Sequence, residues 1–308
     1  MEKNMEISID ADQDGQTVGE YLKKEMHLTK AQIRSLKFRN PGILVNGIPT
    51  RTSHILQKND ILTLFLENPR DASLQIEPVE SPVEILYEDD DVIGVWKPCQ
   101  IATHPAGTHQ RNTMSNYIMG YLLQNNKNAR IRSIGRLDLD TEGILIFAKN
   151  KIAASRLWEQ RRNHLFFKEY LALCQGSFPA SAYEQEQMIS HPIVPAEDGT
   201  KRMKITEHGP EAITYYQPVA RFSHAAEDDN IQTVVRLHLE TGRTHQIRVH
   251  MASIGHPLVD DPLYGFGIIG ESHARLCAWK VCFLQPFTGQ TICLTRRPDR
   301  IPLPSEFF

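Results

Sequence analysis

Residues 135–143, with the sequence Gly-Arg-Leu-Asp-Leu-Asp-Thr-Glu-Gly, place charged side chains between apolar ones, directly before a strand-like apolar run. A carboxylate at the end of a buried strand must be solvated, paired or used in chemistry. One interpretation is structural, because Asp140 and Thr141 are residue types common in turns and caps. That interpretation is the more frequent one for an isolated acidic turn. A polar cluster at 241–250 favours a functional site instead, because it could supply the counter-charge.

The length and composition of the chain predict a globular protein of about two domains. Its 308 residues are 41% hydrophobic and 23% charged, which is the range of ordinary globular proteins. No run approaches the ~18 consecutive apolar residues of a membrane-spanning helix. Residues 1–6 lack the apolar segment of a signal peptide. We therefore expect a cytoplasmic protein that does not associate with membranes.

The cysteines give no support for a disulfide framework or a structural zinc site. Their number is odd, and none of them shows Cys-x-x-Cys spacing. Apolar neighbours surround several of them, as expected of small buried side chains. We expect a structural role for all five, which are Cys99, Cys174, Cys277, Cys282 and Cys293.

Charge is distributed unevenly along the chain. The whole chain carries a net charge of −3, whereas residues 16–66 contain eight basic and three acidic residues and the remainder is acidic. Such asymmetry indicates a basic module with a polyanionic partner, attached to an acidic body. A merely solvated basic face is the alternative that charge alone leaves open.

Local patterns predict a small N-terminal module and a larger body. Thr17 and Glu20 have the spacing of a capping box before a helix through residue 26, and a second helix follows at 30–38. Strands are expected at 43–48 and 61–65, joined by turns. The predicted domains are a module at 1–66, a proline-containing linker at 67–82 and a body at 83–308.

Strands dominate the body, and helices are interspersed irregularly. This pattern predicts an α+β fold with a mixed, largely antiparallel sheet. Helices are expected at 114–123, 151–162 and just after Thr244. The expected strands are 83–87, 92–97, 131–136, 144–148, 166–174 and 233–239.

Three groups of residues carry the candidate chemistry. The first is Asp138, and the second is a strand whose alternation puts Lys168 and Tyr170 on one face. The third is the cluster around a short helix at 243–250. Helical spacing places Arg243 and Arg248 on different sides of that helix, so either arginine could face a partner.

The N-terminal module resembles the small alpha-L RNA-binding module of some ribosomal proteins and RNA-modifying enzymes. The resemblance rests on Leu-Thr-Lys-Ala-Gln-Ile-Arg at 28–34 and Gly-Ile-Leu-Val-Asn-Gly at 42–47. It implies that four basic residues face phosphates, which provide affinity and position rather than sequence choice. They are Lys30, Arg34, Lys37 and Arg39.

The body resembles RNA pseudouridine synthases of the large RluA-type family. The ordered motifs are Arg-Leu-Asp-x-x-Thr-x-Gly at 136–143, Lys-x-Tyr at 168–170 and Thr-Gly-Arg-x-His-Gln-Ile-Arg at 241–248. Lys-Pro at 97–98 and Asp-Pro-Leu-Tyr-Gly at 261–265 match as well. The resemblance implies a pseudouridine synthase fold and isomerisation of uridine to pseudouridine in structured ribosomal or transfer RNA. We expect a monomer without a cofactor or metal.

The same resemblance implies a role for each matching residue. Asp138 corresponds to the essential aspartate, which attacks the base or the ribose anomeric carbon. Tyr170 corresponds to the tyrosine that stacks on the flipped base, and Arg248 to the arginine that pairs with the aspartate. Arg136 lies close to the flipped nucleotide, while Arg243 and His245 complete the expected RNA-binding residues.

Elementary chemistry is compatible with these roles. The isomerisation breaks a nitrogen–carbon bond and forms a carbon–carbon bond without net redox change, and the chain has neither a nicotinamide-binding glycine motif nor a Walker loop. An arginine within ~4–6 Å lowers the pKa of a carboxylate and keeps it ionised. An aromatic face recovers part of the cost of unstacking a base.

Alternatives remain at several positions. Tyr170 could be a half-buried strand aromatic, and His245, His250 and His256 lack a metal-binding arrangement. A non-enzymatic RNA-binding factor and a hydrolase that uses Asp138 are the competing functions. The chain departs from the commonest family pattern at four positions: Trp96, Gly135, Glu142 and Asp260.

Overall fold

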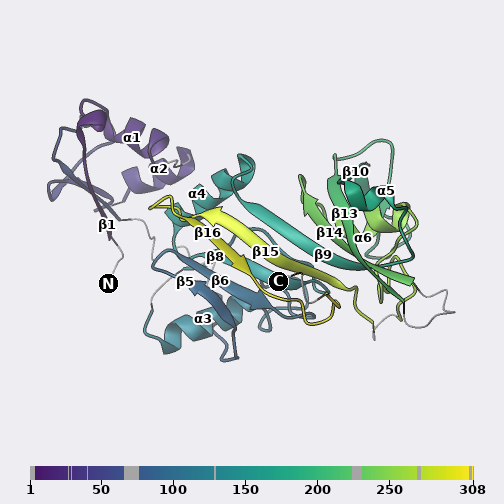
Figure 1. Cartoon of the computed structure of the whole chain (residues 1–308). Helices are drawn as coiled ribbons and strands as arrows, with labels where there is room; N and C mark the ends of the chain where they lie inside the picture. The colour runs from purple at the N-terminus through teal and green to yellow at the C-terminus, as the bar shows by residue number, and fades with distance from the viewer. Residues whose placement is uncertain are drawn as a thin grey trace.

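The computed structural model describes residues 4–26, 28, 30–39, 41–65, 76–127, 130–223, 231–268, 272–304 and 307. A four-stranded sheet with two helices forms the N-terminal part, and a ten-stranded sheet forms the body. Figure 1 shows the N-terminal module at one end of the molecule, beside α4 and β16, and strands β10, β13 and β14 at the other end.

The N-terminal module follows its sequence pattern closely. Thr17 caps the first α-helix, and its side chain and that of Glu20 form the expected capping box. Asn46 and Gly47 take the positive φ angles, 50° and 78°, that a tight turn between strands requires. The strands pair in the order β1-β4-β2-β3. The elements are β1 (Asn4–Ser8), η1 (Ala11–Gln13), α1 (Val18–Lys24), α2 (Lys30–Lys37), β2 (Ile43–Val45), β3 (Ile48–Pro49) and β4 (Ile61–Phe65).

The large sheet has the strand order β10-β13-β14-β9-β15-β8-β6-β5, with β16 beside β15 and β7 beside β8. Among its described pairings, only that of β15 with β8 is parallel. This sheet confirms the expected α+β fold. Its strands are β5 (Ile85–Glu88), β6 (Val92–Lys97), β7 (Arg132–Ser133), β8 (Glu142–Ala148), β9 (Phe167–Gln175), β10 (Gln187–Ser190), β13 (Ile213–Ser223), β14 (Ile231–Leu239), β15 (Leu276–Leu284) and β16 (Thr291–Thr295).

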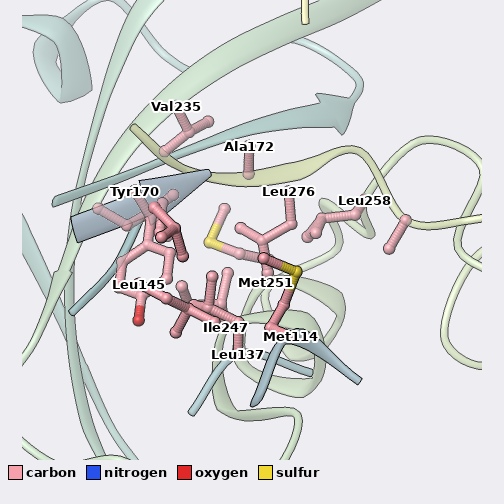
Figure 2. Close-up of a cluster of buried hydrophobic side chains, with 14 of the residues drawn as sticks. Met114, Leu137, Leu145, Tyr170, Ala172, Val235, Ile247, Met251, Leu258 and Leu276 are labelled. Carbon is pink, nitrogen blue, oxygen red and sulfur yellow. The ribbon is translucent and has the colours of Figure 1, made fainter. Parts of the chain in front are cut away.

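Both faces of the large sheet are buried. Tyr170 and Ala172 of β9 belong to one core cluster, together with side chains of α3 and α6, whereas Leu171 and Leu173 belong to a second cluster, together with side chains of α4. Figure 2 shows the first cluster, with Tyr170 at one margin. The remaining elements are α3 (Met114–Gln124), α4 (Lys151–Arg162), α5 (Ser181–Glu184), α6 (Gln246–Ser253) and the hairpin β11 (Ile193–Pro195) with β12 (Met203–Ile205).

The chain between β7 and β8 differs from the expected strand at 131–136. Only Arg132–Ser133 pairs as a strand, because Gly135 has a φ of +87° and turns the chain away from the sheet. β13 and β15 were not expected from the sequence. β15 is buried along most of its length and lacks the polar alternation that identifies a half-buried strand.

No disulfide was expected from the sequence, and that expectation was wrong for one pair of cysteines. Cys282 and Cys293 form a disulfide, while Cys99, Cys174 and Cys277 are free thiols. The two bonded residues lie directly opposite each other on β15 and β16. Sequence spacing does not reveal this pairing, because the register of the two antiparallel strands brings the residues together.

The N-terminal module contacts the body through α4. Ile152, in the first turn of α4, is buried in the core of the module, and Arg156 donates a 3.1 Å hydrogen bond to the carbonyl of Glu25. Residue 66 of the expected module and residues 67–75 of the expected linker lie outside the described residues, so the domain division remains a prediction. Within the described residues, no helix combines the length and the apolar character needed to cross a bilayer.

Candidate active site

The structure brings the three predicted catalytic side chains into one cavity of about 470 Å³, which we call the Asp138 cavity. Asp138 comes from the loop between β7 and β8, Tyr170 from β9 and Arg248 from α6. Three predicted RNA-binding residues, Arg136, Arg243 and His245, also line the Asp138 cavity. Residues far apart in sequence therefore converge on one site.

Hydrogen bonds fix the backbone on both sides of Asp138. The Thr103 hydroxyl accepts from the amide of Leu137 at 3.2 Å and donates to its carbonyl at 3.1 Å. On the other side, Lys97 Nζ and the Gln100 amide donate to the carbonyl of Leu139, at 3.2 and 2.8 Å. These hydrogen bonds hold the backbone on both sides of Asp138 and involve neither oxygen of its carboxylate.

Lys97 is a fully buried cation beneath this loop. Its Nζ also donates to the carbonyls of Pro98 and Ile101, at 3.0 and 2.7 Å. Burial lowers the pKa of Lys97 to about 8, against the opposing influence of nearby Cys99 and Asp138. A buried ammonium group that makes three carbonyl hydrogen bonds holds the loop at a fixed distance from β6.

Arg248 is held by two carboxylates, neither of which is Asp138. Its Nε and Nη2 donate to Asp261 at 2.8 and 2.7 Å, and its Nη1 donates to Asp140 at 3.4 Å. Burial opposes the positive charge of Arg248, but the hydrogen bonds to Asp261 outweigh it and raise the pKa. The expected direct pairing of Arg248 with Asp138 is therefore absent among the described contacts, and the two interact through charge alone.

The Asp138 carboxylate is partly exposed in the cavity. Within the described part of the chain it accepts no hydrogen bond and forms no ion pair, unlike Asp140 and Asp261. The surrounding cations Arg136, Arg161 and Arg243 likewise form no ion pair with a described residue. One uncommitted carboxylate thus lies among three guanidinium groups, none of which is paired with an acid of the described residues.

Tyr170 lies between the apolar core and the cavity. Its side chain is only 9% exposed and packs at the margin of the cluster that contains Leu145 and Ile247 (Figure 2). Burial raises its pKa, as does the negative charge of Asp138, although Arg161 acts in the opposite direction. The hydroxyl therefore stays protonated at neutral pH, and the ring forms a fixed wall of the site.

His245 precedes α6 in the left-handed conformation, with a φ of +55°. Its Nδ1 lies 3.0 Å from the hydroxyl of Tyr264, which accepts a 2.7 Å hydrogen bond from the amide of Met203. Burial and the charge of Arg248 lower the pKa of His245. It is accordingly a neutral hydrogen-bonding group at neutral pH.

The predicted phosphate-binding residues of the N-terminal module lie outside this cavity. Lys30, Arg34 and Lys37 are exposed on α2, where the last two approach the exposed ring of Phe38. Arg39 is half-buried, and its Nη1 donates to the carbonyl of Phe65 at 2.5 Å. Arg39 thus also ties the end of α2 to β4.

Asp140 and Glu142 make the structural contacts expected of a loop scaffold. Asp140 binds Arg248 and lies 3.3 Å from His273, and Glu142 is buried in an ion pair with Arg300. Asp140, His273 and Cys99 could together hold a metal ion, and they are the one such group among the described residues. Arg248 already engages the carboxylate of Asp140.

Four side chains important to the site were not given a role from the sequence. Lys97 and Asp261 lie in motifs that carried the family resemblance, and an acid before proline was the available signal for Asp261. Thr103 and Arg161 have no local signal. They reach the site only because α4 and the loop after β6 pack beside it.

Comparison with known proteins identifies the family. Residues 91–253 match the RNA pseudouridylate synthase family model, and residues 5–62 match the RluD ribosomal pseudouridine synthase N-terminal domain. RNA pseudouridine synthase YhcT of Bacillus subtilis is 32% identical over 94% of this chain and 92% of its own length. The chain belongs to the RNA pseudouridine synthase family, whose members are isomerases.

A second relative agrees with this family, and a solved structure agrees with the fold. Ribosomal large subunit pseudouridine synthase D of Escherichia coli K12 is 37% identical over 62% of this chain and 55% of its own length. The structure of human RNA pseudouridylate synthase domain containing 1 gives a TM-score of 0.58 at 24% identity, over 73% of this chain and 88% of that chain. At that identity the structural likeness supports the fold alone.

Proposed function

We propose that this enzyme converts a uridine of ribosomal RNA to pseudouridine in the Asp138 cavity, with Asp138 as the nucleophile. The observation that carries the proposal is the uncommitted carboxylate of Asp138 among three cations that form no ion pair within the described part of the chain. A polyanionic substrate neutralises such cations. The name of the E. coli relative supports ribosomal RNA as the substrate class and, with it, a cytoplasmic site of action.

Each side chain of the site has its own role in the proposed reaction. Asp138 attacks either the base or the ribose anomeric carbon, and the bond between that carbon and the ring nitrogen N1 breaks in the course of the reaction. The anomeric carbon then bonds to ring carbon C5, the Asp138 carboxylate is released, C5 loses its proton and N1 gains one. Tyr170 offers a rigid aromatic face to the flipped base and a protonated hydroxyl as donor. Arg248, fixed by Asp261, stabilises the charge of Asp138 from a distance. The N-terminal module adds phosphate contacts through Lys30, Arg34 and Lys37.

The test maps pseudouridines in ribosomal and transfer RNA from cells with and without the gene. Cells that lack the gene are complemented with wild type, Asp138→Asn or the control Asp260→Asn. We expect wild type and Asp260→Asn to restore a lost pseudouridine and Asp138→Asn to restore none. The Asp138 carboxylate makes no described hydrogen bond, so its amide variant should keep the fold.

Each result has a separate meaning. Restoration by Asp138→Asn would overturn the assignment of the nucleophile. A pseudouridine lost only from transfer RNA would overturn the substrate class but retain the chemistry. An unchanged pseudouridine map in both RNA classes would refute the proposed function.

A further inference from the structure

A second cavity adjoins the Asp138 cavity. It has a volume of about 570 Å³, and we call it the Lys168 cavity. The two cavities share Arg136, Arg161, Tyr170 and Leu239 in their walls. An RNA strand with one nucleotide in the Asp138 cavity can therefore continue into the Lys168 cavity only by passing these side chains.

Arg161 lies at this shared wall, in the last turn of α4. Its guanidinium packs against Gly135 and Gly242, so closely that a Cβ atom at either glycine would collide with it. The ring of Trp158 lies 5.3 Å from its Cζ. Within the described part of the chain Arg161 forms no ion pair.

A solvated helix residue is the alternative explanation for Arg161. The next residue, Arg162, has that character: both arginines are exposed, but Arg162 lines neither cavity. Arg161 differs because it lines both cavities and its guanidinium lies over Gly135 and Gly242 of the Asp138 cavity. A cation at the junction of the two cavities is placed to meet the phosphate of a strand that enters both.

The lining of the Lys168 cavity is divided by chemistry. Arg161 and Lys168 lie on its basic side, where burial, together with the charge of Arg161, lowers the pKa of Lys168. The rings of Tyr215 and His238 stack with centroids 4.6 Å apart on its aromatic side. Glu240 accepts a 3.0 Å hydrogen bond from Tyr215 there, so a phosphate is disfavoured on this side and a base is not.

We propose that the Lys168 cavity binds the nucleotide adjacent to the target uridine, and that Arg161 binds the phosphate joining the two nucleotides. Its volume is in the range of small-molecule sites. The aromatic side receives the neighbouring base, and Lys168 faces the backbone. This inference rests on the proposed function, because it takes the Asp138 cavity as the site of the target uridine.

The test removes the charge on each side of the proposed contact in turn. The substrate is a synthetic RNA stem–loop that contains the uridine found by mapping, either unmodified or with one neutral methylphosphonate at a linkage near that uridine. The enzymes are wild type, Arg161→Gln, Arg161→Lys and the matched control Arg162→Gln. Pseudouridine formation gives KM and kcat, and thermal unfolding checks that each variant is folded.

We expect Arg161→Gln to raise KM about tenfold and to leave kcat within about twofold, because a charged phosphate contact is lost. Arg161→Lys should recover part of the affinity, and Arg162→Gln should match wild type. One methylphosphonate next to the target uridine should raise KM about tenfold for wild type and Arg162→Gln, but not further for Arg161→Gln. Equal KM values for Arg161→Gln and Arg162→Gln would overturn the proposal. So would a methylphosphonate effect on KM that adds to the effect of Arg161→Gln at every linkage tested.

A binding experiment distinguishes a failure of this inference from a failure of the proposed function. The salt dependence of affinity is measured with a labelled oligouridylate, for which each phosphate contact contributes about 0.7 to the logarithmic slope. We expect Arg161→Gln to lower the slope by about that amount relative to Arg162→Gln. If wild type formed no pseudouridine but the slopes differed, only the proposed function would fail. Equal salt slopes for Arg161→Gln and Arg162→Gln would refute the role of Arg161, whether or not the enzyme forms pseudouridine.

Discussion

The buried pair of Asp261 and Arg248 should dominate the stability of the site, and Asp261→Asn tests this. Asp261 is fully buried and accepts four hydrogen bonds, two from Arg248 and one each from the amides of Leu263 and Tyr264. An asparagine keeps the shape but turns an NH2 group toward one arginine donor. Removing one member of a buried ion pair costs about 3–5 kcal/mol. For a domain of this size that corresponds to a fall in Tm of roughly 6–20 °C.

The matched control is Asp260→Asn at the neighbouring position. Asp260 is 40% exposed and pairs with Arg275 at 2.7 Å, and such surface pairs contribute less than about 1 kcal/mol. Urea unfolding followed by tryptophan fluorescence measures the free energy of unfolding of both variants. The reasoning fails if Asp261→Asn and Asp260→Asn destabilise the protein equally. The double variant Asp261→Asn/Arg248→Met should lose less stability than the sum of its single substitutions, because neither member of the buried Asp261–Arg248 pair then remains as a charge without the other.

Two further predictions concern RNA binding. Replacing Lys30, Arg34 and Lys37 with glutamine should lower the logarithmic salt slope of RNA affinity by about 2 to 3, since each phosphate contact contributes about 0.7–0.9; an unchanged slope in filter binding would exclude α2 from the interface. Burial, with the charge of Arg161, lowers the pKa of Lys168 to about 7. Lys168 is therefore protonated below that pH and neutral above it, so affinity at fixed salt should fall as pH rises through about 7. Lys168→Arg should remove that part of the pH dependence, and identical pH profiles for the two proteins would contradict the prediction.

The sequence predicted those features that depend on local pattern. The capping box at Thr17, the turn at Asn46 and the alternation along β9 are each determined within a few residues. Ordered motifs also placed Asp138, Tyr170 and Arg248 at one site, and the structure brings them together. Their chemical roles remain predictions.

Features that depend on packing between distant segments were not predictable in the same way. Cys282 and Cys293 have no recognisable spacing, and only strand register makes them a disulfide. Arg161 reaches the site because α4 packs across the large sheet and two glycines leave room for its guanidinium. No pattern near residue 161 contains this information.

The partner of Arg248 shows why the site needs more than one carboxylate. If Asp138 were bound to Arg248 through both of its oxygens, its lone pairs would be engaged and its attack on uridine would have to break that pair first. Asp261 takes this position instead, and Asp140 engages the remaining nitrogen. The hydrogen bonds and charge of Asp261 are the main reason that the pKa of Arg248 is raised, and the charges of Asp140 and Asp138 add to it, so Arg248 still interacts electrostatically with Asp138. Because Asp261 and Asp140 engage Arg248, the carboxylate of Asp138, the proposed nucleophile, is left available to react.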